Sequence, residues 1–204
     1  MTANKKLYKA ISNIAYGFIF ILIHIKIGPF DILPDFVGFI LISLSVISLK
    51  DECKTIGLLK PLGIFLSVWE AAELLLSFTD TATILMAGRL TSVITIINIY
   101  FYFQLFTDIS HIAEKYQPEG SNFDKKLITR RNIYVISETV IFLLTYLILN
   151  TDTLAQNDLS AYILVPVSII NLIVLLLIVS ALFSFRKIFK AEEINAEIPD
   201  SNTE

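Results

Sequence analysis

Three glutamates of this chain lie inside long apolar stretches, where an ionised carboxylate is costly. Glu70 and Glu73 interrupt the run 61–78, and Glu138 interrupts the run 132–149. A charged side chain at the centre of a bilayer costs at least ~2.5–3.5 kcal/mol on insertion scales. Residues of this kind face a protein interior or a water-filled path, where they bind protons or cations. We therefore take the three glutamates as candidates for a substrate or ion pathway.

Two interpretations of the polar residues in these runs are open. In the first, the carboxylates are protonatable or cation-binding groups of a pathway. In the second, they only join helices, since hydrogen bonds across membrane helices contribute about 0.6 kcal/mol each on average. We favour packing for the serines, threonines and asparagines and keep both interpretations for the acids. The candidate pathway also includes Asn98, Asn171 and Arg89. Arg89 is expected either to pair with Glu73 or to reach the outer lipid headgroups.

Helical spacing assigns the acids of the run 61–78 to one face. At 100° per residue, Glu70 and Glu73 share a face with small and polar residues, namely Gly63, Ser67, Ala71 and Ser77. The opposite face is apolar and consists of Ile64, Phe65, Val68, Leu75 and Leu76. This segregation predicts that both carboxylates face protein and that the opposite face contacts lipid.

The elements that must position these residues are six apolar runs. They cover residues 10–27, 32–49, 61–78, 84–106, 132–149 and 161–185. A membrane-spanning helix needs about 20 mostly apolar residues, with a range of about 17–25. The chain of 204 residues is 55% hydrophobic, and its mean hydropathy is +0.70. The sequence therefore predicts an all-α integral membrane bundle of six transmembrane helices.

The basic residues predict the orientation of this bundle. All 16 Lys and Arg residues except Lys26 and Arg89 fall at the N-terminus, around the second and fourth connections, and after the last run. Loops rich in Lys and Arg stay in the cytoplasm. We expect a multipass protein of the cell membrane with both termini cytoplasmic, whose basic loops contact anionic lipids. The same topology explains the basic residues without any nucleic acid partner.

The boundaries of several elements are also predicted. We assign residues 1–190 to the six-helix domain and residues 191–204 to an acidic, disordered cytoplasmic tail. Asp31 is expected to cap the second helix, with Pro34 in its first turn. The fourth helix should continue past the membrane along its surface over residues 107–117, and Ser121 or Asn122 should cap the basic lead-in to the fifth.

A polar cluster is expected at the outer end of the first two helices. His24, Asp31 and Asp35 fall there, but their spacing matches no metal-ligand pattern, and helix capping explains both aspartates. We therefore predict no metal and no cofactor. The chain also carries no Gly-rich phosphate loop and no nucleophile with a base and an orienting partner, so we do not expect an enzyme.

The segment from Asp31 to Ile42 reads DILPDFVGFILI. It resembles a segment of uncharacterised multipass membrane proteins from low-GC Gram-positive bacteria, and the abundance of Ile, Lys and Asn fits such a source. The resemblance covers about a dozen residues. It implies a protein of the bacterial inner membrane and no particular activity, so no functional residue is transferred.

The sequence thus supports two functional hypotheses. The first is a small permease-like protein that moves an ion or small solute, with Glu70 and Glu73 at its site and Glu138 in support. The alternative is a non-catalytic scaffold or regulatory subunit that binds a protein partner through the basic segment 107–131. At 204 residues the chain is short for enclosing a pathway alone, so a homo-oligomer is also considered.

Overall fold

The computed structural model describes residues 3–23, 26–27, 30–31, 34–76, 89–150 and 159–197. The α-helices of this part are α1 (Ala3–Leu22), α2 (Asp35–Leu49), α3 (Leu59–Leu76), α5 (Arg89–Tyr116), α6 (Phe123–Asn150) and α8 (Leu159–Glu197). A short 3-10 helix, η1 (Thr55–Leu58), precedes α3. The two-residue strands β1 (Lys26–Ile27) and β2 (Phe30–Asp31) pair in antiparallel fashion. The helical architecture confirms the predicted all-α class.

Three helices of the described part are long and apolar enough to cross a membrane. They supply the stretches Leu90–Tyr116, Phe123–Ile148 and Tyr162–Lys190. The α2 helix is also apolar but has only 15 residues. Helices α1 and α3 are set apart by their charged residues, since α1 carries its lysines at the N-terminal end and α3 carries Lys60 and two glutamates. Length and composition therefore mark the chain as a membrane protein.

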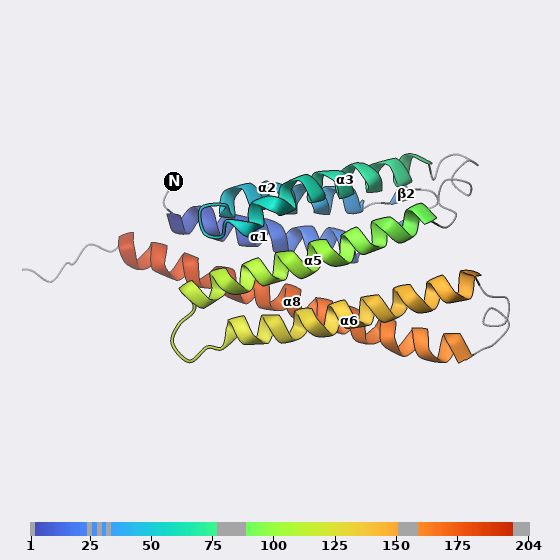
Figure 1. Ribbon diagram of the computed structural model, residues 1–204. Helices are drawn as coiled ribbons and strands as arrows, with labels where there is room; N and C mark the ends of the chain where they lie inside the picture. The colour runs from blue at the N-terminus through green and yellow to red at the C-terminus, as the bar shows by residue number, and fades with distance from the viewer. Residues whose placement is uncertain are drawn as a thin grey trace, which may run out of the picture.

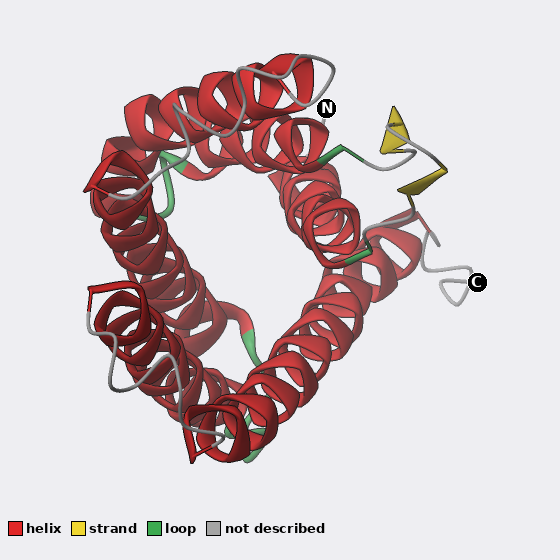
Figure 2. Ribbon diagram, turned by 90° about the vertical axis from the view of Figure 1, so that its right-hand side faces the viewer, coloured by secondary structure: helices red, strands yellow, loops and turns green. Residues whose placement is uncertain are grey.

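The helices form a ring in the order of the sequence. Each helix packs against its neighbours along the chain, and α8 returns to pack against α1. Figure 1 shows the helices lying side by side along one common direction. Figure 2, which looks along that direction, shows the helices arranged as a ring. The ring gives every helix one inward and one outward face.

The segments that carry most basic residues gather at one end of the ring, which we call the basic end. The N-terminal end of α1, the α2–α3 connection, the α5–α6 turn and the C-terminal end of α8 all lie there (Figure 1). Two ion pairs link these segments. The Lys6 ammonium lies 2.9 Å from Asp51, and the Lys115 ammonium lies 2.8 Å from Glu52. The hydrogen bond from Lys115 also lowers the pKa of the Glu52 carboxyl.

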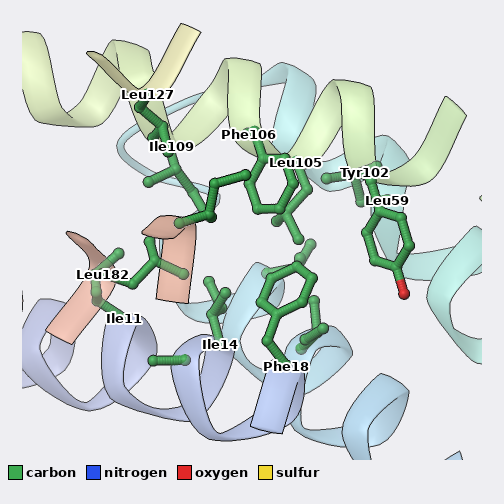
Figure 3. Close-up of a cluster of buried hydrophobic side chains, with 14 of the residues drawn as sticks. Ile11, Ile14, Phe18, Leu59, Tyr102, Leu105, Phe106, Ile109, Leu127 and Leu182 are labelled. Carbon is green, nitrogen blue, oxygen red and sulfur yellow. The ribbon is translucent and has the colours of Figure 1, made fainter. Parts of the chain in front are cut away.

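An apolar core fills the ring beside the basic end. Side chains from α1, α3, α5, α6 and α8 meet in it (Figure 3). Phe18, Leu105, Phe106 and Ile109 are each 0% exposed. Tyr102 lies at the border of this cluster, and Figure 3 shows its hydroxyl pointing away from the apolar side chains. The core therefore ends at Tyr102, where a polar region begins.

The start of α2 differs from the prediction. The helix begins at Asp35, and Pro34 occupies the N-cap position with an extended backbone and no capping side chain. The predicted run began at residue 32 with Pro34 inside the first turn, which is wrong. Proline disfavours helical backbone in the residue before it, so a helix that starts directly after Pro34 avoids that conflict. Residues 32 and 33 lie outside the described part.

The cap of α6 also differs from the prediction. The Gln117 side chain, not Ser121 or Asn122, accepts hydrogen bonds from the backbone amides of Phe123 and Asp124, at 2.8 and 3.2 Å. Ser121 instead donates to the same Gln117 oxygen at 2.9 Å. Asn122 adopts a left-handed backbone with a φ of 49°. The reversal of direction at this turn brings the end of α5 close enough to cap α6.

The last helix is longer than predicted. The expected end of the six-helix domain was residue 190, whereas α8 continues to Glu197. The helix also continues through Pro166. Part of the segment that we expected to be a disordered tail is therefore helical, and residues 198–204 lie outside the described part.

Two glycines allow α1 and α2 to approach closely. A Cβ atom built on Gly17 would lie 2.7 Å from the carbonyl oxygen of Gly38. A Cβ atom on Gly38 would lie 2.5 Å from the Gly17 oxygen and 2.6 Å from Ile21. Small residues at helix crossings permit such backbone contact in membranes. The first hairpin of the ring therefore depends on the absence of side chains at both positions.

Replacement of Gly38 by alanine should separate α1 from α2. We expect Gly38→Ala to lower the free energy of unfolding by about 1–3 kcal/mol, the usual range for overpacking. Unfolding in mixed micelles, followed by circular dichroism, measures the change. Gly57→Ala is the matched control, since the nearest atom to its Cβ would be Lys50 Cγ at 4.0 Å. Equal unfolding curves for the two variants would contradict the close contact.

Candidate functional site

A polar cavity lies between α3, α5 and α6, on the side of the core away from the basic end. Its volume is about 280 Å³. We call this space the acidic cavity. The residues that line it are Trp69, Glu70, Glu73, Thr91, Ile94, Thr95, Asn98, Ile99, Tyr102, Tyr134 and Glu138. The three candidate glutamates thus line one space, together with Asn98. The structure brings together residues that lie far apart in the sequence.

The burial pattern of α3 explains how its glutamates reach this cavity. Gly63, Leu66 and Ser67 are buried, while Val68 and Leu75 are 64% and 70% exposed. Ile64 and Phe65 are also exposed. The predicted division of α3 into a protein face and an outward apolar face is therefore confirmed. The carboxylates lie on the side that faces α5 and α6.

Two of the glutamates are held by hydrogen bonds. The indole N–H of Trp69 donates to Glu73 Oε1 at 2.6 Å, one helical turn away on α3. The Asn171 amide, on α8, donates to Glu138 Oε1 at 2.7 Å. The amide oxygen of Asn171 in turn accepts a hydrogen bond of 2.6 Å from Ser137. These contacts fix both carboxylates at the cavity wall without supplying a positive charge.

Glu70 differs from the other two acids. Within the described part of the chain it accepts no hydrogen bond, although it interacts electrostatically with Glu73 and Asp35. Asp35 also interacts electrostatically with Tyr102, which lines the cavity. Asp35, expected in an outer-end cluster, therefore adds its charge to the surroundings of the acidic cavity.

The acidic cavity has a charge imbalance. None of the described residues that line it is a lysine or an arginine. Several carboxylates close together in a medium of low polarity repel one another and lose hydration. The Asn98 side-chain oxygen is buried and has no hydrogen-bond partner within the described residues. The site therefore offers negative charge and a free acceptor to a proton or a positively charged guest.

A layer of aromatic rings closes the cavity toward the basic end. The Tyr102 ring stacks on Phe106 with centroids 6.2 Å apart, and Phe106 stacks on Phe18 at 5.2 Å. Tyr134 meets Tyr102 edge to face at 5.6 Å. Buried apolar side chains continue beyond these rings toward the basic end, among them Leu105 and Ile109.

Some predicted site residues cannot be placed at the cavity. His24 lies outside the described residues, and only the backbones of Asp31 and Arg89 fall within them. The Asp31 backbone pairs with Lys26 across the short strands. The pairing of Arg89 with Glu73 therefore stays a prediction. The same holds for the outer cluster around His24.

Two features escaped the sequence analysis. The first is Trp69, which lines the cavity and donates a hydrogen bond to Glu73. The only sequence signal for this contact is the spacing of one helical turn between the two residues.

The second is Asp108, which is 1% exposed and accepts hydrogen bonds from Thr55 at 2.6 Å and from Gln104 at 2.9 Å. We expected the stretch 107–117 to run along the membrane surface. Asp108 instead joins α5 to the α2–α3 connection, a contact between segments too distant in sequence to predict.

The alternative hypothesis uses the basic segment 107–131 as a docking surface. Part of this segment is buried in the apolar core. Ile109, Ile112 and Leu127 are at most 1% exposed. Lys125 and Lys126 are exposed at the start of α6. The segment therefore presents charge only along its outer side.

Comparison with known proteins adds no family to this description. No protein-family model, no curated protein and no solved structure gives a significant match to this chain.

Water access to the acidic cavity can be tested with single cysteines. In a Cys53→Ser background, which removes the only cysteine, we expect Thr95→Cys and Asn98→Cys to react with membrane-impermeant methanethiosulfonates. The negative cavity should make a cationic reagent react about tenfold faster than an anionic one of equal size. Leu105→Cys, at a position of the same helix that is 0% exposed, should stay unmodified. No reaction at Thr95 and Asn98 in folded protein would mean a dry interior.

Proposed function

We propose that this chain is a permease-like protein that moves a positively charged ion or small solute across the cell membrane. In this proposal the chain spans the bilayer six times, with both termini in the cytoplasm. The proposal depends on one observation: Glu70, Glu73 and Glu138 line a single cavity, and none of the described residues that line it carries a basic side chain. A passing cation supplies the positive charge that these carboxylates lack.

The glutamates have different roles in this proposal. Glu70, which accepts no hydrogen bond within the described part, binds the positive charge of the solute or the proton that replaces it. Glu73 and Glu138, each held at 2.6–2.7 Å by a donor, set the negative potential of the cavity. Exchange between a proton and a monovalent cation at Glu70 would keep the net charge of the site the same in both states.

The length of the helices supports the six-span arrangement. The α1 and α3 helices have 20 and 18 residues, and α2 has 15. At 1.5 Å per residue, the shortest spans about 22 Å of a hydrocarbon core about 30 Å thick. Residues outside the ends of α2, together with snorkelling lysines such as Lys50, make up the difference. The gathering of basic segments at one end supports the cytoplasmic placement of that end.

Flux measurements on reconstituted protein test the proposal. The purified chain is placed in liposomes that contain a pH-sensitive dye, and gradients of sodium, potassium or choline are applied. We expect at least one gradient to drive a change of internal pH, and Glu70→Gln to reduce its initial rate about tenfold or more. Loss of about 1.4 kcal/mol of cation binding energy produces a tenfold change. Glu73→Gln and Glu138→Gln should show reductions in the same direction.

Glu114→Gln provides the matched control, because Glu114 is an exposed glutamate near the basic end of α5. That variant should retain the flux of the unmodified protein. Size-exclusion chromatography and circular dichroism establish that each variant is folded. If folded protein moves none of the three cations, or if Glu70→Gln retains full flux, the acids serve only to pack helices and the proposal is wrong.

A further inference from the structure

The size of the acidic cavity suits a molecule rather than a bare ion. Its volume of about 280 Å³ is just below the range of drug-sized ligand sites, which begins near 300 Å³, so it suits a smaller molecule. A bound metal cation requires several oxygen ligands at about 2.0–2.6 Å from one point. Among the described residues, no group of three or more His, Cys, Asp and Glu side chains converges in a way that could hold a metal ion. The carboxylates line a cavity and do not converge on one position where a metal ion could bind.

Aromatic rings form a large part of the cavity wall. Trp69, Tyr102 and Tyr134 line it from three different helices. The two tyrosine rings stand at 78° to each other, with centroids 5.6 Å apart, so they form a corner. The faces of such rings attract cations, and tryptophan attracts them most strongly. Aromatic surface also contacts the carbon groups that an organic cation carries and an alkali ion lacks.

The acids and the rings are adjacent. The Trp69 indole N–H is hydrogen-bonded to Glu73 at 2.6 Å, so ring and carboxylate sit together on one wall. Ile94 and Ile99 add apolar surface between the polar groups. The unpartnered Asn98 oxygen can accept a hydrogen bond from an N–H or O–H group of a guest. The cavity thus presents carboxylates, aromatic side chains and one free acceptor within a single small volume.

From this combination we infer that the solute of the acidic cavity is a small organic cation, an alkylated amine or quaternary ammonium compound. This inference rests on the proposed function and names the substrate class of the same site. The carboxylates balance the positive charge, and the rings of Trp69, Tyr102 and Tyr134 contact the alkyl groups around the nitrogen. Recognition of quaternary ammonium groups by aromatic rings is a recurring use of the cation–π interaction.

The protein contains its own reporter for this inference. Trp69 is the only tryptophan of the chain, so the intrinsic tryptophan fluorescence comes from the cavity wall alone. The full chain, purified in a neutral detergent, is titrated with choline chloride and separately with sodium chloride. A third titration uses 3,3-dimethylbutan-1-ol, which has the shape of choline without its charge. We expect a saturable change of Trp69 emission with choline, at a concentration at least tenfold lower than any change with the other two.

A pair of aromatic substitutions separates the rings from the acids. Tyr134→Leu keeps all carboxylates and removes one ring, so it should weaken choline binding by about 2- to 30-fold, the range that a cation–π contact contributes. Phe189→Leu is the matched control, since Phe189 is a fully buried ring that does not line the cavity. It should bind choline as the unmodified protein does. If neither variant folds, the comparison of choline with its neutral analogue on the unmodified protein decides the question.

The outcomes distinguish this inference from the proposed function. If choline and 3,3-dimethylbutan-1-ol change the emission at equal concentrations, the cavity does not recognise the positive charge, and the substrate class is wrong. If sodium binds and crosses the liposome membrane while choline does neither, the cavity is a permease site for inorganic ions and only this inference is overturned. If no cation crosses the membrane, the proposed function fails, whatever the fluorescence shows.

Discussion

The constraint on which this structure depends is the neutralisation of the carboxylates that line the acidic cavity. An ionised carboxylate in a medium of low polarity requires a proton, a cation or several hydrogen bonds. Glu73 and Glu138 receive hydrogen bonds from neutral donors, Trp69 and Asn171, which orient them without balancing their charge. The polar residues of α3, α5 and α6 face the same space as these carboxylates. Helix packing alone would be achieved more cheaply by serine or asparagine.

The ring architecture makes such a space available. In a bundle with a central helix, inward side chains meet another backbone. Here the inward faces meet one another, and large aromatic side chains fill the interior near the basic end, among them Phe18, Phe39 and Phe106. The filling stops at Tyr102, where the rings give way to carboxylates. The position of the cavity therefore follows in part from the order of residues along α5, whose cavity-lining polar residues Thr91, Thr95 and Asn98 precede its buried aromatic residues Phe101, Tyr102 and Phe106.

Much of this arrangement can be predicted from the sequence, because the face of a helix on which a residue lies depends only on the spacing of residues within that helix. The positions of Glu70 and Glu73 relative to Val68 and Leu75 follow from the helical period, and burial confirms the two faces of α3. The polar stripe of α5 follows in the same way. The meeting of Glu138 with the α3 acids required tertiary structure, since no pattern within α6 specifies the helix it will face. The capping of α6 by Gln117 and the burial of Asp108 were missed for the same reason: their partners lie across a turn or in another hairpin.

The contact between α3 and α5 is the least extensive of the interfaces that close the ring, and it borders the acidic cavity. Among the described residues, this edge of the ring therefore has the least packing to lose if two neighbouring helices separate. Separation there would open Glu70 and Asn98 sideways, toward the lipid acyl chains. A guest with an apolar surface and one charge could then enter from within the leaflet, without an aqueous channel leading to either face of the membrane.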